Sequence, residues 1–252
     1  MARDAPPPAP LNSAGPSTRR ASSIYPEIET GLVKTRYHRN VDANREERDF
    51  GLADLADEAW RPAAELGLLL IDPVFWGVGV RRGDERPVLV LPGLHGGDRY
   101  LGPLRDWLRR IGYSPVPSGL DRNPGWSEPL VNALVELAET HFRGTGQRVT
   151  IIGHSMGGLQ GRAVAARRPR VVRHVIALGS PLTMARGRLP DEVRMTAMYS
   201  RGDRIVRHPA AMERDTRATN IEVSGSHIGL TFNPAVYRAL ADALQAPDRE
   251  VI

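Results

Sequence analysis

Cysteine is absent from this sequence of 252 residues, and lysine occurs once, at position 34. Without cysteine the chain forms no disulfide and offers no thiolate ligand to a metal, and its redox compartment cannot be inferred from cysteine use. Aromatic residues make up 6% of the chain, which supplies little for the stacking platforms of nucleic-acid-binding proteins. Long apolar runs are also missing, because residues 66–71 are followed by Asp72-Pro73, so no bilayer-spanning segment is expected.

Positive charge is carried almost entirely by arginine. The net charge is +5 and the pI is about 10. Eleven arginines and three acidic residues fall between residues 161 and 207, among them Arg186, Arg188, Arg194, Arg201, Arg204 and Arg207. We interpret this segment either as a solvated basic surface or as a docking surface for an anionic membrane or an acyl carrier. The high pI is also compatible with a non-catalytic basic binding protein. However, the sequence has no recognition-helix pattern, so no nucleic-acid partner is expected.

Composition changes twice along the chain. Residues 1–49 are rich first in Pro, Ser and Ala and then in mixed charges, which predicts a disordered tail. Residues 50–86 are expected to form a helical and apolar appendage packed on the core, and residues 87–252 have the size of one catalytic domain. The proline-rich first ten residues lack a basic-then-apolar targeting pattern. A cytoplasmic location is therefore expected, with peripheral membrane binding as the alternative.

The appendage has apolar residues at helical spacing from Phe50 to Ile71. Pro62 is expected to kink this helix or to begin a second one. The end of the appendage, residues 68–76, is the most apolar and aromatic stretch of the chain. Packing against the sheet is its expected role, and docking to a membrane surface or a second copy is the alternative.

From Arg86 onward, short apolar runs alternate with segments of helical period. The run 87–91 is continuously apolar, as expected of a strand buried on both faces of a parallel sheet. Further strands are predicted at 113–117, 149–152, 171–178, 195–199 and 220–223, and helices at 101–111, 128–142, 159–168 and 234–244. This alternation predicts an α/β fold with a doubly wound, mostly parallel sheet of about six core strands. Only residues 181–194 separate two of the strands, so a minimal cap is expected.

Ser155 lies in the sequence Gly153-His154-Ser155-Met156-Gly157-Gly158, between a predicted strand and a predicted helix. Strand, sharp glycine-flanked turn and helix are the context of a G-x-S-x-G nucleophile elbow. Such a turn is strained, so its flanking positions cannot carry large side chains, and the helix N-terminus beneath it favours a developing oxyanion. The alternative is a glycine-rich turn with an incidental serine.

Asp203 and His227 each follow a later predicted strand, where active sites of open α/β sheets lie. A serine hydroxyl becomes a good nucleophile when a base takes its proton and a third group orients that base. We therefore expect Ser155 as nucleophile, His227 as base and Asp203 as orienting acid. A turn acid and a packed loop histidine are the alternatives for these two residues taken singly. Three such positions in the order of a catalytic triad argue for catalysis.

The oxyanion of a tetrahedral intermediate needs two backbone N–H donors. We expect one from Met156 and the other from Leu94, because Pro92-Gly93 turns the chain just before it. Residues expected to line the substrate site are His95, His154, Pro181 and Leu182. No histidine pair has metal-ligand spacing with a carboxylate nearby, so no metal and no cofactor is expected.

The chain resembles the α/β-hydrolase superfamily, and within it the small, nearly lidless bacterial lipases of the class 2 type. Three motifs carry the resemblance: Gly-His-Ser-Met-Gly-Gly at 153–158, Tyr-Ser-x-x-Asp-x-Ile-Val at 199–206 and Gly-x-His-Ile-Gly-Leu at 225–230. It spans about residues 87–244 and implies the same triad and the same oxyanion donors. Those lipases usually carry His-Gly before the oxyanion residue, whereas this chain has Pro92-Gly93 and places His95 after it.

We therefore predict a serine hydrolase of the lipase or esterase type that cleaves esters of lipid-like or acyl-chain substrates through an acyl-enzyme. A thioesterase or acyltransferase with the same triad is the alternative within this fold. The short connection 181–194 predicts an open site, which suits long-chain or bulky esters. The expected partners are an acyl-chain ester and, at the arginine-rich surface, an anionic membrane or an acyl carrier.

Overall fold

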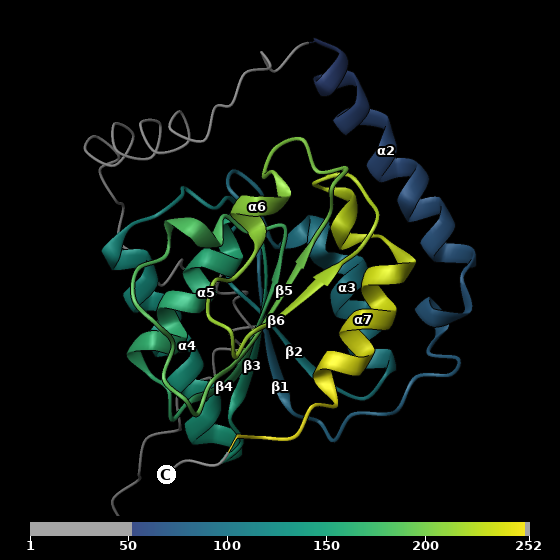
Figure 1. Ribbon diagram of the computed structural model, residues 1–252. Helices are drawn as coiled ribbons and strands as arrows, with labels where there is room; N and C mark the ends of the chain where they lie inside the picture. Colours follow the sequence, from purple (N-terminus) through teal and green to yellow (C-terminus); the bar gives the residue numbers. More distant parts are fainter. Residues whose placement is uncertain (1–51, 250–252) are drawn as a thin grey trace, which may run out of the picture.

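A parallel six-stranded sheet is the centre of the computed structural model, which describes residues 52–249 (Figure 1). The tail predicted at residues 1–49 lies outside these described residues. The strand order is β2-β1-β3-β4-β5-β6, and every neighbouring pair is parallel. The strands span Pro87–Leu91 (β1), Ser114–Pro117 (β2), Val149–His154 (β3), Val172–Leu178 (β4), Arg194–Tyr199 (β5) and Thr219–Glu222 (β6). The predicted α/β fold class is confirmed.

Helices cover both faces of the sheet. Figure 1 shows α4 (Glu128–Thr145) and α5 (Met156–Arg167) over one face, and α3 (Gly102–Arg110) and α7 (Pro234–Leu244) over the other. Residues of β1 alternate between the two resulting cores, with Val88 and Val90 on the side of α3 and α7 and with Leu89 and Leu91 on the opposite side. Because successive strand residues point to opposite faces, a sheet covered on both faces requires a fully apolar strand.

The carboxyl ends of all six strands lie along one edge of the sheet, because the strands run in the same direction. The loops that leave this edge contain three short 3-10 helices and one short α-helix: η2 (Asp98–Leu101), η3 (Leu182–Met184), η4 (Gly229–Thr231) and α6 (His208–Ala211). Between β4 and β5 the fully described connection contains only η3, so no helical cap is inserted there, as predicted.

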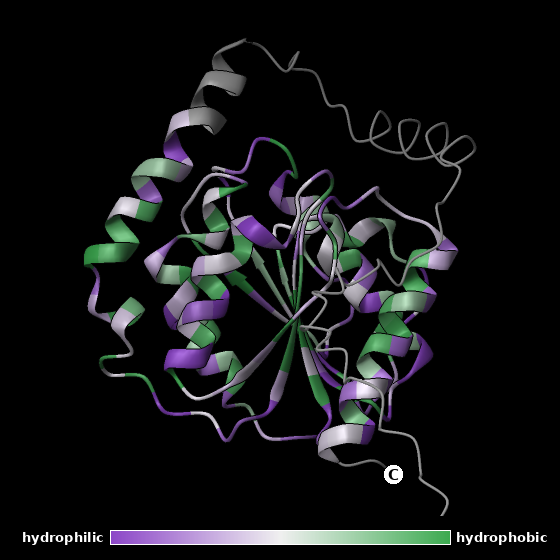
Figure 2. Ribbon diagram, turned by 180° about the vertical axis from the view of Figure 1, so that it is seen from behind, coloured by the Kyte–Doolittle hydropathy of each residue, from purple (hydrophilic) through white to green (hydrophobic). Residues whose placement is uncertain are grey.

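The N-terminal elements pack on the outside of the α3 and α7 layer. They are α2 (Leu52–Ile71) and η1 (Pro73–Trp76), and Figure 1 shows α2 running along the edge of the molecule. Val74 and Phe75 are buried, and the Trp107 indole N–H donates to the Val74 carbonyl over 2.9 Å. Ile71 and Trp76, in contrast, are 78% and 56% exposed. The stretch 68–76 thus packs on the core with one side and exposes apolar side chains on the other. Figure 2 shows the hydrophobic colouring of the end of α2 at the edge of the molecule.

Pro62 does not begin a second helix, and the alternative in which it does is wrong: α2 runs through it as one helix of 20 residues. A proline inside a helix removes one i→i−4 hydrogen bond and crowds the preceding turn. The Pro62 ring is itself buried, so its packing offsets part of that loss. Helix propensity read from sequence does not contain this tertiary contribution.

Candidate active site

Ser155 occupies the turn between β3 and α5 with backbone angles φ 53° and ψ −122°. A positive φ is strained for a residue with a side chain, and strain of this kind is common at functional sites. A strained serine on a strand-to-helix turn is the geometry of a nucleophile elbow. On the sheet side, the Ser155 N–H donates to the Leu178 carbonyl of β4 over 2.8 Å. The hydroxyl is therefore carried above the sheet at the N-terminus of α5, where the helix dipole favours negative charge.

Two glycines of the motif are required by close packing of backbone on backbone. A Cβ atom at Gly153 would lie 2.4 Å from the Gly157 carbonyl carbon, and a Cβ at Gly157 would lie 2.4 Å from the Leu91 carbonyl oxygen. Neither obstacle is a flexible side chain that can move aside. The glycine spacing in the sequence therefore reflects how tightly the elbow sits against β3 and the end of β1.

Asp203 and His227 form a buried pair, with the His227 Nδ1 atom 2.7 Å from Asp203 Oδ2. Asp203 is 3% exposed and His227 is 4% exposed. Asp203 Oδ1 accepts hydrogen bonds from the backbone N–H groups of Ile205 and Val206 at 2.9 and 2.8 Å, so the carboxylate is held in one orientation. Because a carboxylate only accepts, Nδ1 of a neutral His227 carries the proton, and Nε2 is the nitrogen that can take a proton from a hydroxyl.

The three predicted triad residues come from loops after β3, β5 and β6 and converge at the same edge of the sheet. A Cβ built on Gly179 would lie 2.9 Å from Asp203 Oδ2 and 3.4 Å from His227 Nδ1. The ring centroids of His227 and His154 are 4.8 Å apart, and His154 directly precedes Ser155. The structure thus places the predicted acid and base in contact, and their loop against the residue that directly precedes the predicted nucleophile.

His154 links the histidine loop to the loop after β1. Its buried ring is neutral, because burial and, secondly, the electrostatic effect of the neighbouring His227 ring lower its pKa to about 3. The Nε2 atom donates to the His227 carbonyl oxygen over 2.9 Å, since a carbonyl can only accept. Nδ1 then accepts from the Tyr100 hydroxyl at 2.9 Å, and that hydroxyl accepts from the Gly93 N–H at 2.7 Å. His154 was predicted to line the substrate site, whereas in the structure its buried ring bridges the two loops.

The N–H groups of the two predicted oxyanion donors have no acceptor among the residues that the structure describes. Within residues 52–249, neither the Leu94 nor the Met156 N–H donates a hydrogen bond. The loop that carries Leu94 is held by hydrogen bonds of the residues on either side of Leu94. The His95 N–H donates to the Asn123 carbonyl at 2.8 Å, and the Asn123 side chain donates to the Pro92 carbonyl at 2.8 Å. Both amides are therefore available to an oxyanion, as the prediction requires.

Asn123, which was not predicted as a site residue, is fully buried. Its amide group also exchanges hydrogen bonds with Gln160 of α5 at 2.9 and 3.1 Å. These contacts tie the loop after β1 to the helix that begins at the elbow. The sequence gives no signal for this pair, because both residues lie in segments without a recognisable polar motif.

The remaining residues predicted to line the site differ in position. His95 is exposed with φ 61°, and the Arg122 Nε atom lies 3.4 Å from its Nδ1. Pro181 is half-buried, whereas Leu182 is 3% exposed and packs in the core beneath α4 and α5. Leu182 thus contributes to the packing under the β4–β5 connection.

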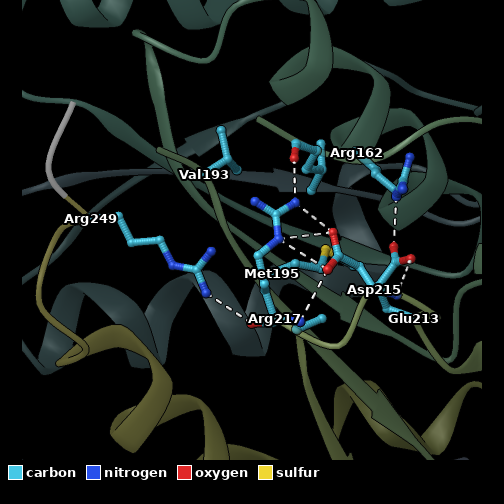
Figure 3. Close-up of a pocket in the computed structure, with 9 residues that line it drawn as sticks. Arg162, Val193, Met195, Glu213, Asp215, Arg217 and Arg249 are labelled. Carbon is cyan, nitrogen blue, oxygen red and sulfur yellow. Dashed lines mark hydrogen bonds and ion pairs between the residues drawn. The ribbon is translucent and has the colours of Figure 1, made fainter. Parts of the chain in front are cut away.

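Arg162 of α5 forms a buried ion pair beside this connection, with Nε 2.7 Å from Glu213 Oε2 (Figure 3). Its Nη2 atom donates to the Gly187 carbonyl at 2.7 Å, which holds the connection against the elbow helix. The cavity around this ion pair measures about 10 Å³ and is not lined by Ser155, Asp203 or His227. It is too small for a substrate, so this cluster is a brace of the fold rather than a binding site.

The arginine-rich segment is not a single surface. Arg186 and Arg188 are exposed on the β4–β5 connection, and Arg201 pairs with Glu222 at 2.9 Å. Arg194 was expected in the same loop, and this is wrong. It is the first residue of β5, at the edge of the sheet opposite Ser155, and donates to the Pro247 carbonyl at 3.0 Å. The strand starts one residue earlier than predicted, so Arg194 lies at its amino end.

Among residues 52–249, no group of three or more His, Asp and Glu side chains is arranged to hold a metal ion. In the same part of the chain, no helix combines the length and the apolar character needed to cross a bilayer.

The sheet topology and the strained serine elbow define an α/β-hydrolase fold. Residues 132–213 match the model of the family described as alpha/beta hydrolase fold. This match includes Ser155 and Asp203 and ends before His227.

Solved structures with the same fold include three lipolytic or esterolytic enzymes. The monoacylglycerol lipase of Paleococcus ferrophilus aligns with a TM-score of 0.51 at 13% identity, over 66% of this chain and 96% of that one. The metagenome-derived lipolytic enzymes LipS and LipT are represented by a structure with a TM-score of 0.50 at 13% identity, over 66% and 96%. A carboxylesterase from Mesorhizobium loti has a TM-score of 0.50 at 12% identity, over 66% and 91%. At such identities the likeness concerns the fold.

Proposed function

We propose that this chain is a serine hydrolase that cleaves carboxylic esters through an acyl-enzyme, with Ser155, His227 and Asp203 as its catalytic triad. The observation that carries the proposal is the buried 2.7 Å contact between His227 Nδ1 and Asp203 Oδ2, next to a serine in a strained elbow. A buried Asp–His pair alone, or a strained serine alone, also occurs in proteins that are not enzymes. Their combination at the carboxyl edge of the sheet is what acyl transfer from a serine requires.

In the proposed reaction, the Ser155 hydroxyl oxygen attacks the ester carbonyl carbon while His227 Nε2 takes the hydroxyl proton. Asp203 holds Nδ1–H and stabilises the imidazolium that forms. The N–H groups of Leu94 and Met156 stabilise the oxyanion of the tetrahedral intermediate. His227 then protonates the leaving alcohol, the acyl group stays on Ser155, and water activated by His227 releases it as the acid.

An acyl chain is the proposed substrate feature. The connection between β4 and β5 inserts no helical cap above the site, and an open site admits long or bulky acyl groups. The three enzymes compared above are described as lipolytic or as a carboxylesterase, which agrees with this substrate class. Exposed Arg186 and Arg188 on that connection support an anionic surface or an acyl carrier as the form in which the substrate arrives.

A series of p-nitrophenyl esters from acetyl to palmitoyl, each paired with the matching thioester, tests this proposal. We expect hydrolysis of the esters with a preference for medium or long chains, and loss of turnover in Ser155→Ala. Faster turnover of every thioester than of its ester would favour a thioesterase with the same triad. No turnover of either series by the intact chain would contradict the proposal.

A further inference from the structure

We propose that Glu65, on the N-terminal helix α2, is a positioning residue for the catalytic histidine, an inference that rests on the proposed function. Its carboxylate lies against Ser226, the residue immediately before His227. The helix that the sequence could describe only as an appendage would then take part in catalysis.

The contact is a paired hydrogen bond across 161 positions of the chain. The Ser226 backbone N–H donates to Glu65 Oε1 at 3.0 Å, and the Ser226 hydroxyl donates to Glu65 Oε2 at 2.8 Å. Ser226 is fully buried. A buried N–H and O–H without an acceptor would each cost about 1–3 kcal/mol, so the carboxylate satisfies groups that would otherwise destabilise this loop.

The Ser226 hydroxyl also connects Glu65 to a residue beyond His227. Its oxygen accepts from the Gly229 N–H at 3.2 Å, so one carboxylate orders residues on both sides of the histidine. Glycines adjoin the carboxylate on both sides as well. A Cβ at Gly229 would lie 1.2 Å from Glu65 Oε2, and a Cβ at Gly225 would lie 3.1 Å from Oε1. The loop is shaped to admit this carboxylate.

Other contacts of the same loop come from the body of the fold. Ser200 and Asn233 side chains donate to the carbonyls of Gly225 and Ser224 at 2.7 and 2.6 Å, and His154 holds the His227 carbonyl. All three act on carbonyl groups. Glu65 acts on N–H and O–H donors, so its contribution is not duplicated by them. A displacement of the imidazole by about 1 Å can cost up to about a hundredfold in turnover.

The test compares Glu65→Ala, Glu65→Gln and a matched control, Arg238→Ala, in the full-length protein. Arg238 ties the same N-terminal segment to α7, because its Nη2 atom lies 2.7 and 2.8 Å from the two carboxylate oxygens of Asp72. It is outside the histidine loop. We expect Glu65→Ala to lower kcat for a soluble butyryl ester about ten- to hundredfold with little change in KM. Glu65→Gln should recover part of kcat, since its amide oxygen can still accept from the Ser226 N–H while its NH₂ group can only donate to the hydroxyl.

A second readout follows the loop directly. Amide hydrogen exchange in the peptide spanning residues 224–232 should speed up in Glu65→Ala and not in Arg238→Ala, at matched distance below each melting temperature. If Glu65→Ala and Arg238→Ala lose stability alike and keep wild-type kcat, Glu65 only fastens the helix, and the inference is overturned. If the wild-type chain itself hydrolyses no ester, the proposed function falls and the catalytic meaning of Glu65 falls with it. An active wild type with an unaffected Glu65→Ala variant would overturn the role of Glu65 alone.

Discussion

The two carboxylate oxygens of Asp203 have different hydrogen-bond partners, so the substitution Asp203→Asn tests the role of this residue. Oδ1 accepts from the Ile205 and Val206 N–H groups, and Oδ2 faces His227 Nδ1. In Asp203→Asn the amide oxygen must stay toward the two N–H groups, so the NH₂ group faces Nδ1. Nδ1 then accepts, the proton moves to Nε2, and the base is lost. We expect kcat to fall by about four decades.

Steady-state hydrolysis of a butyryl ester measures this loss, with the exposed Asp121 as control. Asp121→Asn changes the same functional group at an exposed position, and it should keep wild-type kcat. A loss of less than tenfold in Asp203→Asn would show that Asp203 does not orient the base.

Loss of the Tyr100 hydroxyl should lower both the stability of the protein and its kcat. Its hydroxyl accepts from the Gly93 N–H and donates to His154 Nδ1, and burial raises the pKa of the phenol, so it stays neutral. Tyr100→Phe leaves both partners without their hydrogen bond, which should destabilise the protein by about 1–3 kcal/mol.

Because Gly93 directly precedes the proposed oxyanion donor, Tyr100→Phe should also lower kcat about tenfold, as expected when a catalytic group is slightly displaced. Urea unfolding and ester kinetics on the same preparation measure the two effects. Tyr113→Phe is the control, because its hydroxyl accepts from Gln245 at 3.0 Å, away from the elbow. Equal kinetics in the two variants would mean that the hydroxyl of Tyr100 has no special role.

At the scale of single residues, the sequence predicted those whose chemistry is local and missed those defined by distant contacts. Ser155, Asp203 and His227 could be proposed as a triad because each follows a predicted strand and their order fits one. Glu65 and Tyr100 contact partners 161 and 54 positions away. No spacing rule connects them to the motif, so only the folded chain reveals them.

The need for glycine in the elbow can be tested by comparing Gly157 with a glycine that has space for a side chain. A Cβ at Gly157 would meet the Leu91 carbonyl oxygen at 2.4 Å, whereas a Cβ at Gly144 of α4 has nothing within 4 Å. We expect Gly157→Ala to destabilise the protein by about 1–3 kcal/mol or more, because the backbone of β1 cannot give way. Gly144→Ala should stabilise it by about 0.4–1 kcal/mol through lower entropy of the unfolded chain.

Urea unfolding of both variants decides the point, and esterase activity gives a second reading. Gly144→Ala should keep full activity, whereas Gly157→Ala should lose it even where it remains folded. If both substitutions have the same small effect on stability, the close approach of the elbow to β1 is not as described.

The elements themselves were predictable because strands and helices alternate with clear periods. Predicted strands at 87–91 and 195–199 appear at Pro87–Leu91 and Arg194–Tyr199, and the predicted helix at 234–244 appears at Pro234–Leu244. The short helix α6 and the 3-10 turns were not predicted, since they span one turn and have no periodic pattern. Arg194 was predicted in the β4–β5 connection near the site, but that connection crosses from the carboxyl edge to the amino edge of the parallel sheet, so its last residues lie far from Ser155.

For the whole molecule, two buried histidines make stability depend on pH. Burial is the largest cause that lowers the pKa of both His154 and His174 from the usual 6.5 to about 3. Between these values the unfolded chain binds protons that the folded protein does not. The free energy of unfolding therefore rises with pH from about 3 to about 6.5 and falls on acidification. Each histidine should contribute up to about 1.4 kcal/mol per pH unit in this window.

Urea unfolding at about pH 7 and about pH 5 measures this dependence. His174→Gln should flatten it, because His174 lies in β4 far from the elbow loop and can be removed without touching the proposed triad. Equal slopes in the two proteins would show that His174 does not stay neutral in the fold.

Covalent labelling of Ser155 tests the central claim most directly. A fluorophosphonate reacts with a serine only when a base and an oxyanion site activate it. We expect the wild-type protein to gain one phosphonyl group, located at Ser155 by peptide mass mapping, and the Ser155→Ala variant to gain none. Labelling of the Ala variant at the wild-type rate, or a label on another residue of the wild type, would contradict the account.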